Sequence, residues 1–237
     1  MKAVILAGGL GHRLRPFTEV IPKPLLPLGE RSVLEVQIAA LSRAGADEVI
    51  VATNYKSRLI EAFVGDGSRF GLRVTFSQEL TPLGTAGPLS LLRDRLDEPF
   101  LMMNGDVLTK LDFARFYEFG VREAADLTVG TKVITTPFRF GNVHVADGGH
   151  IVGVDEKPEF TLEIVAGIYC MKPSVFRLIP VNQYYGMDML IKRMIAANER
   201  VARYLIQDYW LDIGQVDDYS KARSDYEQHF SEEEQIA

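Results

Sequence analysis

The first 27 residues constrain this chain most, because they place a short apolar segment before three glycines and a proline-rich stretch. Residues 2–7, KAVILA, have the length and apolar content of a buried strand. Gly8, Gly9 and Gly11 follow at once, and prolines at 16, 22, 24 and 27 exclude an immediate helix. Glycines at the end of a strand let backbone N–H groups approach an anion, since no Cβ atom interferes. Taken alone, the three glycines fit a tight turn better than a binding loop.

The charges of the same stretch strengthen the interpretation of an anion site. Residues 1–29 contain four cations, of which Arg13, Arg15 and Lys23 lie close together, and a single anion, whereas the whole chain has a net charge of −6. An acidic chain argues against general binding of nucleic acid, which requires a basic face. Arginine forks contact phosphate oxygens in pairs, and lysine supplies a mobile charge. The sequence therefore predicts a local site for a triphosphate.

Apolar segments alternate with helical patterns over the first half of the chain. Strands are expected at residues 2–7, 48–53, 72–77 and 100–103, and helices from Ser32 to Gly45 and at 58–64, 87–96 and 112–124. This alternation is typical of an α/β fold, so we expect a Rossmann-like mixed, mainly parallel sheet flanked by helices.

The second half begins with a β-rich part. Strand-like segments follow residue 126, with a hairpin turn at Asp147-Gly148-Gly149, and these form an expected insertion. Helix, strand and a polar C-terminal helix are then expected at 187–198, 201–206 and 216–230.

Several classes of protein are excluded or disfavoured. A dinucleotide-binding oxidoreductase is a poor fit because leucine occupies position 14, where the fingerprint needs its third glycine, and a Walker A motif is absent. Cys170 is the only cysteine, which excludes an internal disulfide and a cysteine-rich zinc site. No apolar run approaches the length that crosses a bilayer, and no secretory pattern occurs at the start. We expect a cytoplasmic protein with no membrane or nucleic-acid partner.

Two aspartates follow strand-like segments far apart in the chain. Asp106 ends FLMMNGD, and Asp212 lies in YWLDIG. Two carboxylates beside a triphosphate would suit Mg²⁺, which takes a few oxygen ligands together with phosphate oxygens. Asn-Gly-Asp on its own is more typical of a simple turn.

The opening motif resembles the signature of the sugar-phosphate nucleotidyltransferases, also called nucleoside-diphosphate-sugar pyrophosphorylases. The residues that carry the resemblance are LAGGxGxRLxPxT at 6–18 and KPL at 23–25, followed in order by PLGTAGP at 82–88, NGD at 104–106, EKP at 156–158, AGIY at 166–169 and WLDIG at 210–214. The resemblance covers the chain to about Tyr219. The sequence departs from the family at His12, where Thr or Ser is usual, and we assign His12 no catalytic role.

The resemblance implies a set of site residues. Nucleotide-binding positions would be Leu6, Ala7, Gly8, Gly9, Gly11, Arg13, Lys23, Gln78, Gly84, Thr85, Asn104 and Gly105. Sugar-binding positions would be Gly141, Glu156, Lys157 and Gly167, with Lys157 contacting the phosphate of a sugar 1-phosphate. Arg13, Lys23 and Lys157 would be catalytic, and Asp106 and Asp212 would bind Mg²⁺ or Mn²⁺.

The implied reaction joins a sugar 1-phosphate to a nucleoside triphosphate and releases pyrophosphate. The segment PLGTAGPL is most similar to the corresponding segment of mannose-1-phosphate guanylyltransferases. The C-terminal half resembles bacterial enzymes that guanylylate heptose or amino-sugar 1-phosphates for surface glycans. GTP is therefore favoured. The alternatives are UTP or dTTP with a hexose 1-phosphate, or a non-catalytic protein that binds nucleotide sugars.

The domain organisation follows from the same comparison. We expect one domain, with residues 1–125 mainly binding the nucleotide, 126–215 mainly binding the sugar and supplying the second metal ligand, and 216–237 forming a C-terminal helix. A domain of hexapeptide repeats is not expected. A homodimer is compatible with the sequence, which does not establish one.

Overall fold

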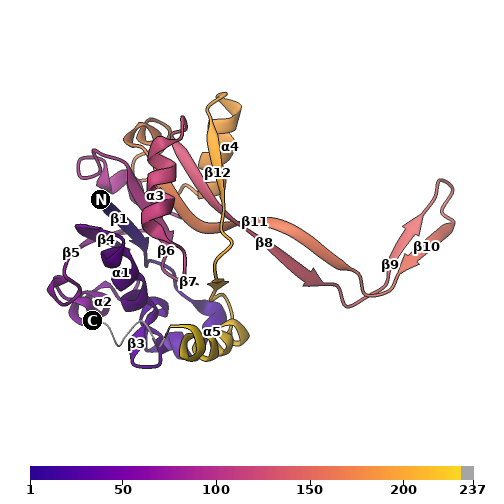
Figure 1. Ribbon diagram of the computed structural model, residues 1–237, viewed down its shortest axis with the longest axis horizontal. Helices are drawn as coiled ribbons and strands as arrows, with labels where there is room; N and C mark the ends of the chain where they lie inside the picture. Colours follow the sequence, from indigo (N-terminus) through magenta and orange to yellow (C-terminus); the bar gives the residue numbers. More distant parts are fainter. Residues whose placement is uncertain (231–237) are drawn as a thin grey trace.

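A seven-stranded sheet forms the centre of the computed structural model, which describes residues 1–230 (Figure 1). In spatial order the strands are β12 (Val201–Leu205), β8 (Leu127–Pro137), β11 (Glu159–Met171), β6 (Phe100–Asn104), β1 (Lys2–Leu6), β4 (Glu48–Thr53) and β5 (Arg73–Gln78). β1 pairs in parallel with β4 and β6, and β4 with β5, whereas β11 is antiparallel to both β6 and β8. The mixed, mainly parallel sheet predicted from the sequence is confirmed.

Helices cover both faces of this sheet because its strands carry apolar side chains on both sides. The α-helices are α1 (Val33–Arg43), α2 (Ser57–Val64), α3 (Phe113–Arg122), α4 (Met187–Ala196) and α5 (Val216–His229). Short 3-10 helices occur at His12–Leu14, Phe17–Glu19, Lys23–Leu25, Ser68–Phe70, Gly87–Leu92 and Pro173–Leu178. Among residues 1–230, no helix has both the length and the apolar character required to cross a bilayer.

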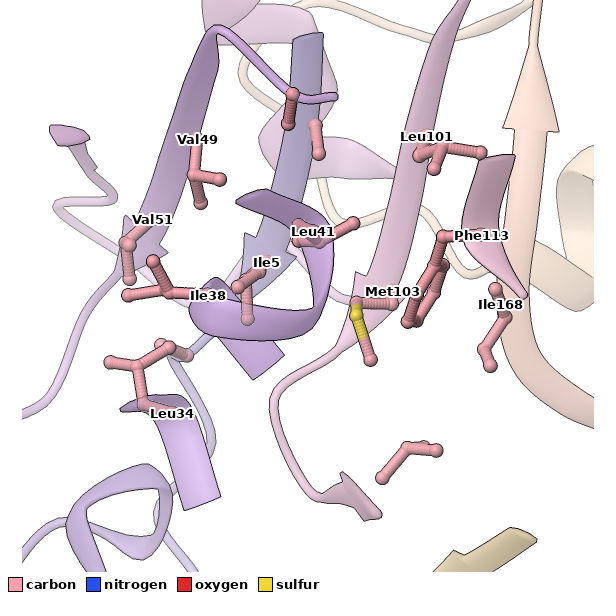
Figure 2. Close-up of a cluster of buried hydrophobic side chains, with 14 of the residues drawn as sticks. Ile5, Leu34, Ile38, Leu41, Val49, Val51, Leu101, Met103, Phe113 and Ile168 are labelled. Carbon is pink, nitrogen blue, oxygen red and sulfur yellow. The ribbon is translucent and has the colours of Figure 1, made fainter. Parts of the chain in front are cut away.

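Alternate residues of β1 pack into two separate cores. Ile5 faces a core built with α1, α2 and α3, in which Leu34, Ile38 and Leu41 of α1 lie against the sheet (Figure 2). Val4 faces the opposite core, which α4 and the 3-10 helices at Gly87–Leu92 and Pro173–Leu178 cover. The predicted start of α1 is also confirmed, since Ser32 accepts a hydrogen bond from the Glu35 amide and donates its own amide to the Glu35 carboxylate.

Three two-stranded sheets complete the fold: β2 (Pro27–Leu28) with β3 (Arg31–Ser32), β7 (Val107–Thr109) with β13 (Trp210–Asp212), and β9 (Asn142–Val145) with β10 (Ile151–Asp155). The β7–β13 pair places Asp212 opposite Val107, next to Asp106. A third core lies beneath α5 and joins it to β2, β7 and the start of α1.

Two sequence expectations need correction or completion. The helix predicted at 87–96 is a 3-10 helix that ends at Leu92, and its first residue, Gly87, is a poor former of an α-helix. The β-rich part is more extended than a compact insertion: β8 and β11 belong to the central sheet and then continue as a ribbon that projects from the body (Figure 1). The last part of the predicted C-terminal segment, residues 231–237, lies outside the described residues.

Candidate active site

A cavity of about 500 Å³ lies where the first glycine loop meets the carboxyl ends of β1 and β6. Its lining residues are Leu6, Gly8, Gly9, Leu10, Gly11, His12, Arg13, Lys23, Glu79, Pro82, Gly84, Thr85, Asn104, Asp106, Tyr184 and Gly214. Ligands of open α/β sheets bind at this edge. The cavity has the size of a nucleotide site, and backbone of the glycine loop forms much of one wall.

The glycine loop is held open by contacts that leave no room for a larger residue. Gly11 has φ 64°, and a Cβ atom there would approach Thr18 Cγ2 to 2.8 Å. Thr18 is buried, and its hydroxyl donates a 2.8 Å hydrogen bond to the Gly11 carbonyl. The loop conformation therefore depends on glycine at position 11, and its backbone stays accessible to an anion.

The Asn104–Val107 turn contributes Asn104 and Asp106 to the cavity wall. The Gly105 amide donates to the Leu6 carbonyl at 2.8 Å, and a Cβ atom on Gly105 would lie 2.5 Å from that oxygen. From α1, the buried Gln37 amide donates to the carbonyls of Asn104 (2.9 Å) and Val107 (2.8 Å). This single side chain fixes both ends of the turn that carries Asp106.

Charged groups of opposite sign meet at the centre of the site. Lys23 Nζ lies 2.5 Å from Asp106 Oδ2, and the two side chains are 11% and 27% exposed. Asp212 is half-buried beside them, linked through the Ile213 amide, which donates to the Asp106 carbonyl at 2.9 Å. Burial, and then the Asp106 carboxylate, raises the pKa of Asp212, while Lys23 and Arg13 act in the opposite direction. Arg13, Lys23 and Asp106 thus line one corner of the cavity, and Asp212 adjoins this corner without lining the cavity.

These residues fit a magnesium ion. Asp106 Oδ1 is buried and has no hydrogen-bond partner among the described residues, so an oxygen atom is left available for a ligand. Within residues 1–230, no cluster of three or more His, Cys, Asp or Glu side chains is arranged to hold a metal. A pair of hard oxygen donors beside a phosphate-sized cavity suits Mg²⁺, which completes its coordination with water and phosphate oxygens.

The loop at 83–87 forms the far end of the cavity. It is tied to the segment before α4, because the Ala86 and Gly87 amides donate to the Tyr185 carbonyl and Thr85 Oγ1 accepts from the Met187 amide at 2.8 Å. Tyr184 lines the same end and is exposed. Backbone groups and one aromatic ring at this position can recognise a planar base.

Glu79 is a cavity residue that the sequence-based set missed. It is 7% exposed, accepts a 2.8 Å hydrogen bond from the Leu83 amide, and lies against Gly8, where a Cβ atom would approach Glu79 Oε1 to 2.8 Å. Burial raises the pKa of Glu79. Its neighbour Gln78, which was predicted to bind nucleotide, is exposed and does not line the cavity. Side chains alternate along β5, so only one of the two adjacent residues can point inward.

The other predicted residues divide between the cavity and the projecting ribbon. Ala7 and Gly105 support the walls without lining them, and Gly167 packs against Asn104. Gly141, Glu156 and Lys157 lie on or beside the hairpin strands of the ribbon, and none of them lines the cavity. The residues missed as lining were Leu10, Glu79, Pro82, Tyr184 and Gly214, while His12, which received no role, does line it. Leu10, Pro82 and Gly214 lie inside the quoted motifs and Glu79 follows Gln78, whereas no quoted motif adjoins Tyr184.

Known proteins resemble this chain over nearly its whole described length. The family described as nucleotidyl transferase matches residues 2–229. A probable mannose-1-phosphate guanylyltransferase 1 of Oryza sativa subsp. japonica is 37% identical over 227 residues, which cover 92% of this chain and 63% of that protein.

Solved structures have the same fold. A putative glucose-1-phosphate thymidylyltransferase from Bacillus anthracis superposes with a TM-score of 0.78 at 24% identity, covering 94% of both chains. HddC from Yersinia pseudotuberculosis complexed with GMP-PN gives a TM-score of 0.73 at 26% identity, covering 95% of this chain and 99% of that one.

An α/β sheet with a glycine-rich cavity at its carboxyl edge, lined by Arg13, Lys23 and Asp106, has the architecture typical of nucleotide-binding α/β proteins. The chain belongs to the nucleotidyl transferase family. It spans 63% of the length of the Oryza relative.

Proposed function

We propose that the protein is a sugar-1-phosphate nucleotidyltransferase that uses GTP and a mannose-, heptose- or amino-sugar-type 1-phosphate. The observation that carries the proposal is the Lys23–Asp106 pair at the mouth of the glycine loop, with Asp212 beside it. Family membership and the Oryza relative support the reaction class.

The nucleotide would lie with its phosphates along the glycine loop and its base toward the 83–87 loop. Arg13 and Lys23 are the cationic side chains that line the cavity, and both can contact phosphate oxygens. The preference for guanine is supported by the guanylyltransferase relative and by the GMP-PN complex of HddC. The same proposal includes the expectation that residues 1–125 mainly bind the nucleotide and residues 126–215 mainly bind the sugar. It also includes a cytoplasmic location.

The sugar 1-phosphate would be bound by residues of the second half. Gly167 adjoins Asn104 at the cavity wall, where a Cβ atom would lie 2.6 Å from the Asn104 amide nitrogen. Lys157, Glu156 and Gly141 are proposed to complete the sugar subsite, with the Lys157 amine on the phosphate. All three lie on the projecting ribbon and do not line the cavity of their own chain.

The reaction needs no protein nucleophile. An oxygen of the sugar phosphate forms a bond to the α-phosphorus, the bond from that phosphorus to the β-phosphate oxygen breaks, and pyrophosphate leaves with the electron pair. Because both reactants are anions, the protein would act by positioning and charge stabilisation, with Arg13 and Lys23 on the triphosphate. When bound by Asp106 and Asp212, Mg²⁺ would add positive charge near the reacting phosphates.

A pyrophosphate-release screen tests the proposal. Purified protein is assayed with GTP, UTP, dTTP, CTP and ATP against a panel of sugar 1-phosphates, and we expect GTP with a mannose-, heptose- or amino-sugar-type 1-phosphate to give the highest kcat/KM. The highest rate with UTP or dTTP would replace the proposed base. Tight binding of a nucleotide sugar without turnover in any combination would indicate a binding protein instead.

The lysine of the central pair provides the matched test. Lys23→Ala should lower kcat by about 100-fold or more, because a preorganised charge is lost where negative charge develops. Lys221→Ala on α5 removes an exposed lysine outside the cavity and should leave the rate unchanged. Thermal melts of both variants check the fold. A large loss of stability in Lys23→Ala without a specific loss of rate would assign Lys23 a structural role.

A further inference from the structure

The ribbon formed by residues 132–165, here called the β-arm, projects from the body of the molecule (Figure 1). β8 and β11 pair continuously from Thr131–Val165 to Pro137–Glu159, and the Phe138 amide then donates to the Pro158 carbonyl at 2.9 Å. The β9–β10 hairpin forms the tip. Since β8 is parallel to β6, the β-arm leaves the sheet at the same carboxyl edge that holds the cavity.

The base of the β-arm is fixed to the body. The ladder shifts register between Val165 and Tyr169, and within this irregularity Gly167 has φ 70° and packs against Asn104. The Trp210 indole donates a 2.9 Å hydrogen bond to the Ala166 carbonyl. These contacts set the direction in which the β-arm leaves, so swinging it would disrupt packing beside the cavity.

Lys157 lies far along this ribbon. β11 is continuously paired from Val165 to Glu159, six positions that correspond to about 20 Å at about 3.3 Å per residue, and Lys157 lies two residues further out, beyond the end of that strand. Reaching the cavity of its own chain would require breaking the β8–β11 ladder. Lys157 has φ 47°, an unusual conformation for a lysine, and its side chain is 71% exposed, with Nζ 4.0 Å from Glu156 Oε1. Its amine is therefore presented outward at a defined place on the β-arm.

One face of the β-arm is mostly apolar, with Lys132 and Thr136 as polar members of its β8–β11 ladder. By the register of the ladder, Ile134 and Leu162 are opposite each other and share a face with Phe138, Phe160 and Ile164. The Phe138 and Phe160 rings lie 5.9 Å apart. A two-stranded ribbon with such a face is marginally stable in water unless something covers it.

The exposed apolar area matches what a dimer buries. Eleven large apolar side chains of the β-arm are exposed, from Val133 at 43% to Phe140 at 71%. At roughly 90 Å² each they present roughly 1,000 Å² per copy, counted over both faces of the β-arm because Val133 and Val165 lie opposite the apolar face. A stable interface buries about 800 Å² per partner, and the largest apolar patch of a monomer is about 300–600 Å².

We propose that the occupant is a second copy of this chain, and that each β-arm lies across the cavity edge of the other copy and delivers Glu156 and Lys157 to it. Because the β-arm and the cavity share one edge of the sheet, two copies facing each other across a two-fold axis place each β-arm along the other's cavity. Docking in this way keeps the β8–β11 ladder intact. The proposal rests on the proposed function, since it makes Lys157 of one copy complete the sugar-phosphate subsite of the other.

Mixed dimers test the proposal. Two differently tagged chains are co-expressed, one carrying Asp106→Asn and the other Lys157→Ala, and dimers that carry both tags are purified on two affinity columns. Each variant alone is expected to be inactive. In the mixed dimer, the unaltered cavity of the Lys157→Ala chain receives an unaltered β-arm, so pyrophosphate release should return to about half of the wild-type rate per dimer. In this pair, exchange of subunits can lower the recovered rate but cannot create it, because both homodimers are inactive.

The matched control reverses the arrangement. A chain with both substitutions is paired with a wild-type chain. The wild-type cavity is unaltered but receives the β-arm that carries Lys157→Ala, and the other cavity carries Asp106→Asn, so this dimer should be inactive. Delivery within one chain predicts the opposite pair of results and would overturn the proposal, as would a monomer in light scattering or full activity of Lys157→Ala alone. Wild-type protein that is inactive with every substrate pair would instead reject the proposed function, and this inference with it.

Discussion

The ion pair between Lys23 and Asp106 is the contact that most directly indicates the chemistry of the site. Eighty-three positions separate them, yet their charged atoms lie 2.5 Å apart, while Asp106 Oδ1 is left without a partner among residues 1–230. The lysine holds one carboxylate oxygen and leaves the other for a ligand. Such an arrangement suits a metal-and-phosphate site better than a purely structural ion pair, which would satisfy both oxygens.

Replacing Asp106 with Asn tests this at the scale of a single side chain. The substitution keeps the size of the residue but removes the charge, so the Mg²⁺-dependent rate should fall by about 100-fold or more. Addition of GTP and Mg²⁺ should also raise the thermal midpoint of this variant less than that of the wild type, because a ligand stabilises in proportion to its affinity. Pyrophosphate release and thermal melts over a series of Mg²⁺ concentrations give the two readouts.

The matched control for this variant is Asp97→Asn, which alters an exposed aspartate that pairs with Lys2 outside the cavity. It should respond to GTP and Mg²⁺ like the wild type. An Asp106→Asn protein with an unchanged rate and an unchanged Mg²⁺ response would remove Asp106 from the metal site.

Several lining residues could be predicted from the sequence because they lie in contiguous motifs that begin where a strand ends. Gly8, Gly9 and Gly11 are of this kind. The contact of Glu79 with Gly8 could not be predicted, and neither could the support that Gln37 gives to Asn104 from outside the cavity, since both arise only when separate elements pack. Gln37 lies among Leu34, Ile38 and Leu41 on the apolar side of the predicted helix. A polar residue at such a position indicates a buried hydrogen bond, but it does not indicate the partner.

At the scale of elements, a buried carboxylate joins the edge of the sheet to the segment that leads into β6. Glu48 of β4 accepts hydrogen bonds from Thr75 (2.9 Å) and Arg73 (2.9 Å) of β5, and from Arg95 at 2.7 Å. The alternation of strands and helices was readable from apolar periodicity, but this cross-link was not, because it depends on which strands become neighbours. Burial alone would raise the pKa of Glu48, and the hydrogen bonds from Thr75, Arg95 and Arg73 together lower it below its usual value.

Glu48→Gln should therefore lower stability in a pH-dependent way. A lowered pKa in the folded state means that the charged carboxylate stabilises the wild type above its ordinary pKa of 4.5, and that this contribution is lost as the pH falls through the lower folded value. We expect a loss in the free energy of unfolding of about 1–3 kcal/mol near pH 7, which shrinks toward acidic pH. Denaturant titrations from pH 7 down to the limit of reversible unfolding measure it.

Glu98→Gln, an exposed substitution just before β6, is the control and should change stability little at any pH. A difference between Glu48→Gln and wild type that stays constant with pH would show that shape, rather than charge, sets the contribution of Glu48.

At the scale of the whole molecule, the body and the β-arm differ in how far the sequence anticipated them. The body follows from local patterns, whereas the β-arm depends on pairing between β8 and β11, which start 32 residues apart. The strand pattern and the Gly148-Gly149 turn predicted the hairpin, but nothing local indicates that the ladder continues past the sheet. The motifs therefore identified Gly141, Glu156 and Lys157 as sugar-binding candidates, but they did not predict that these residues lie on a ribbon outside the cavity.

The apolar surface of the β-arm gives a prediction about association. Phe140 is 71% exposed and lies at the start of the hairpin, so Phe140→Ser should leave the fold of one copy intact while weakening the dimer. Loss of about 1.5 kcal/mol of burial at each of two symmetric positions would raise the dimer dissociation constant by about 100-fold. Ile195→Ser, on α4 outside the β-arm and 60% exposed, is the matched control and should leave the constant unchanged. Sedimentation over a dilution series measures both variants, and equal dissociation constants for Phe140→Ser and wild type would show that this part of the β-arm does not meet a second copy.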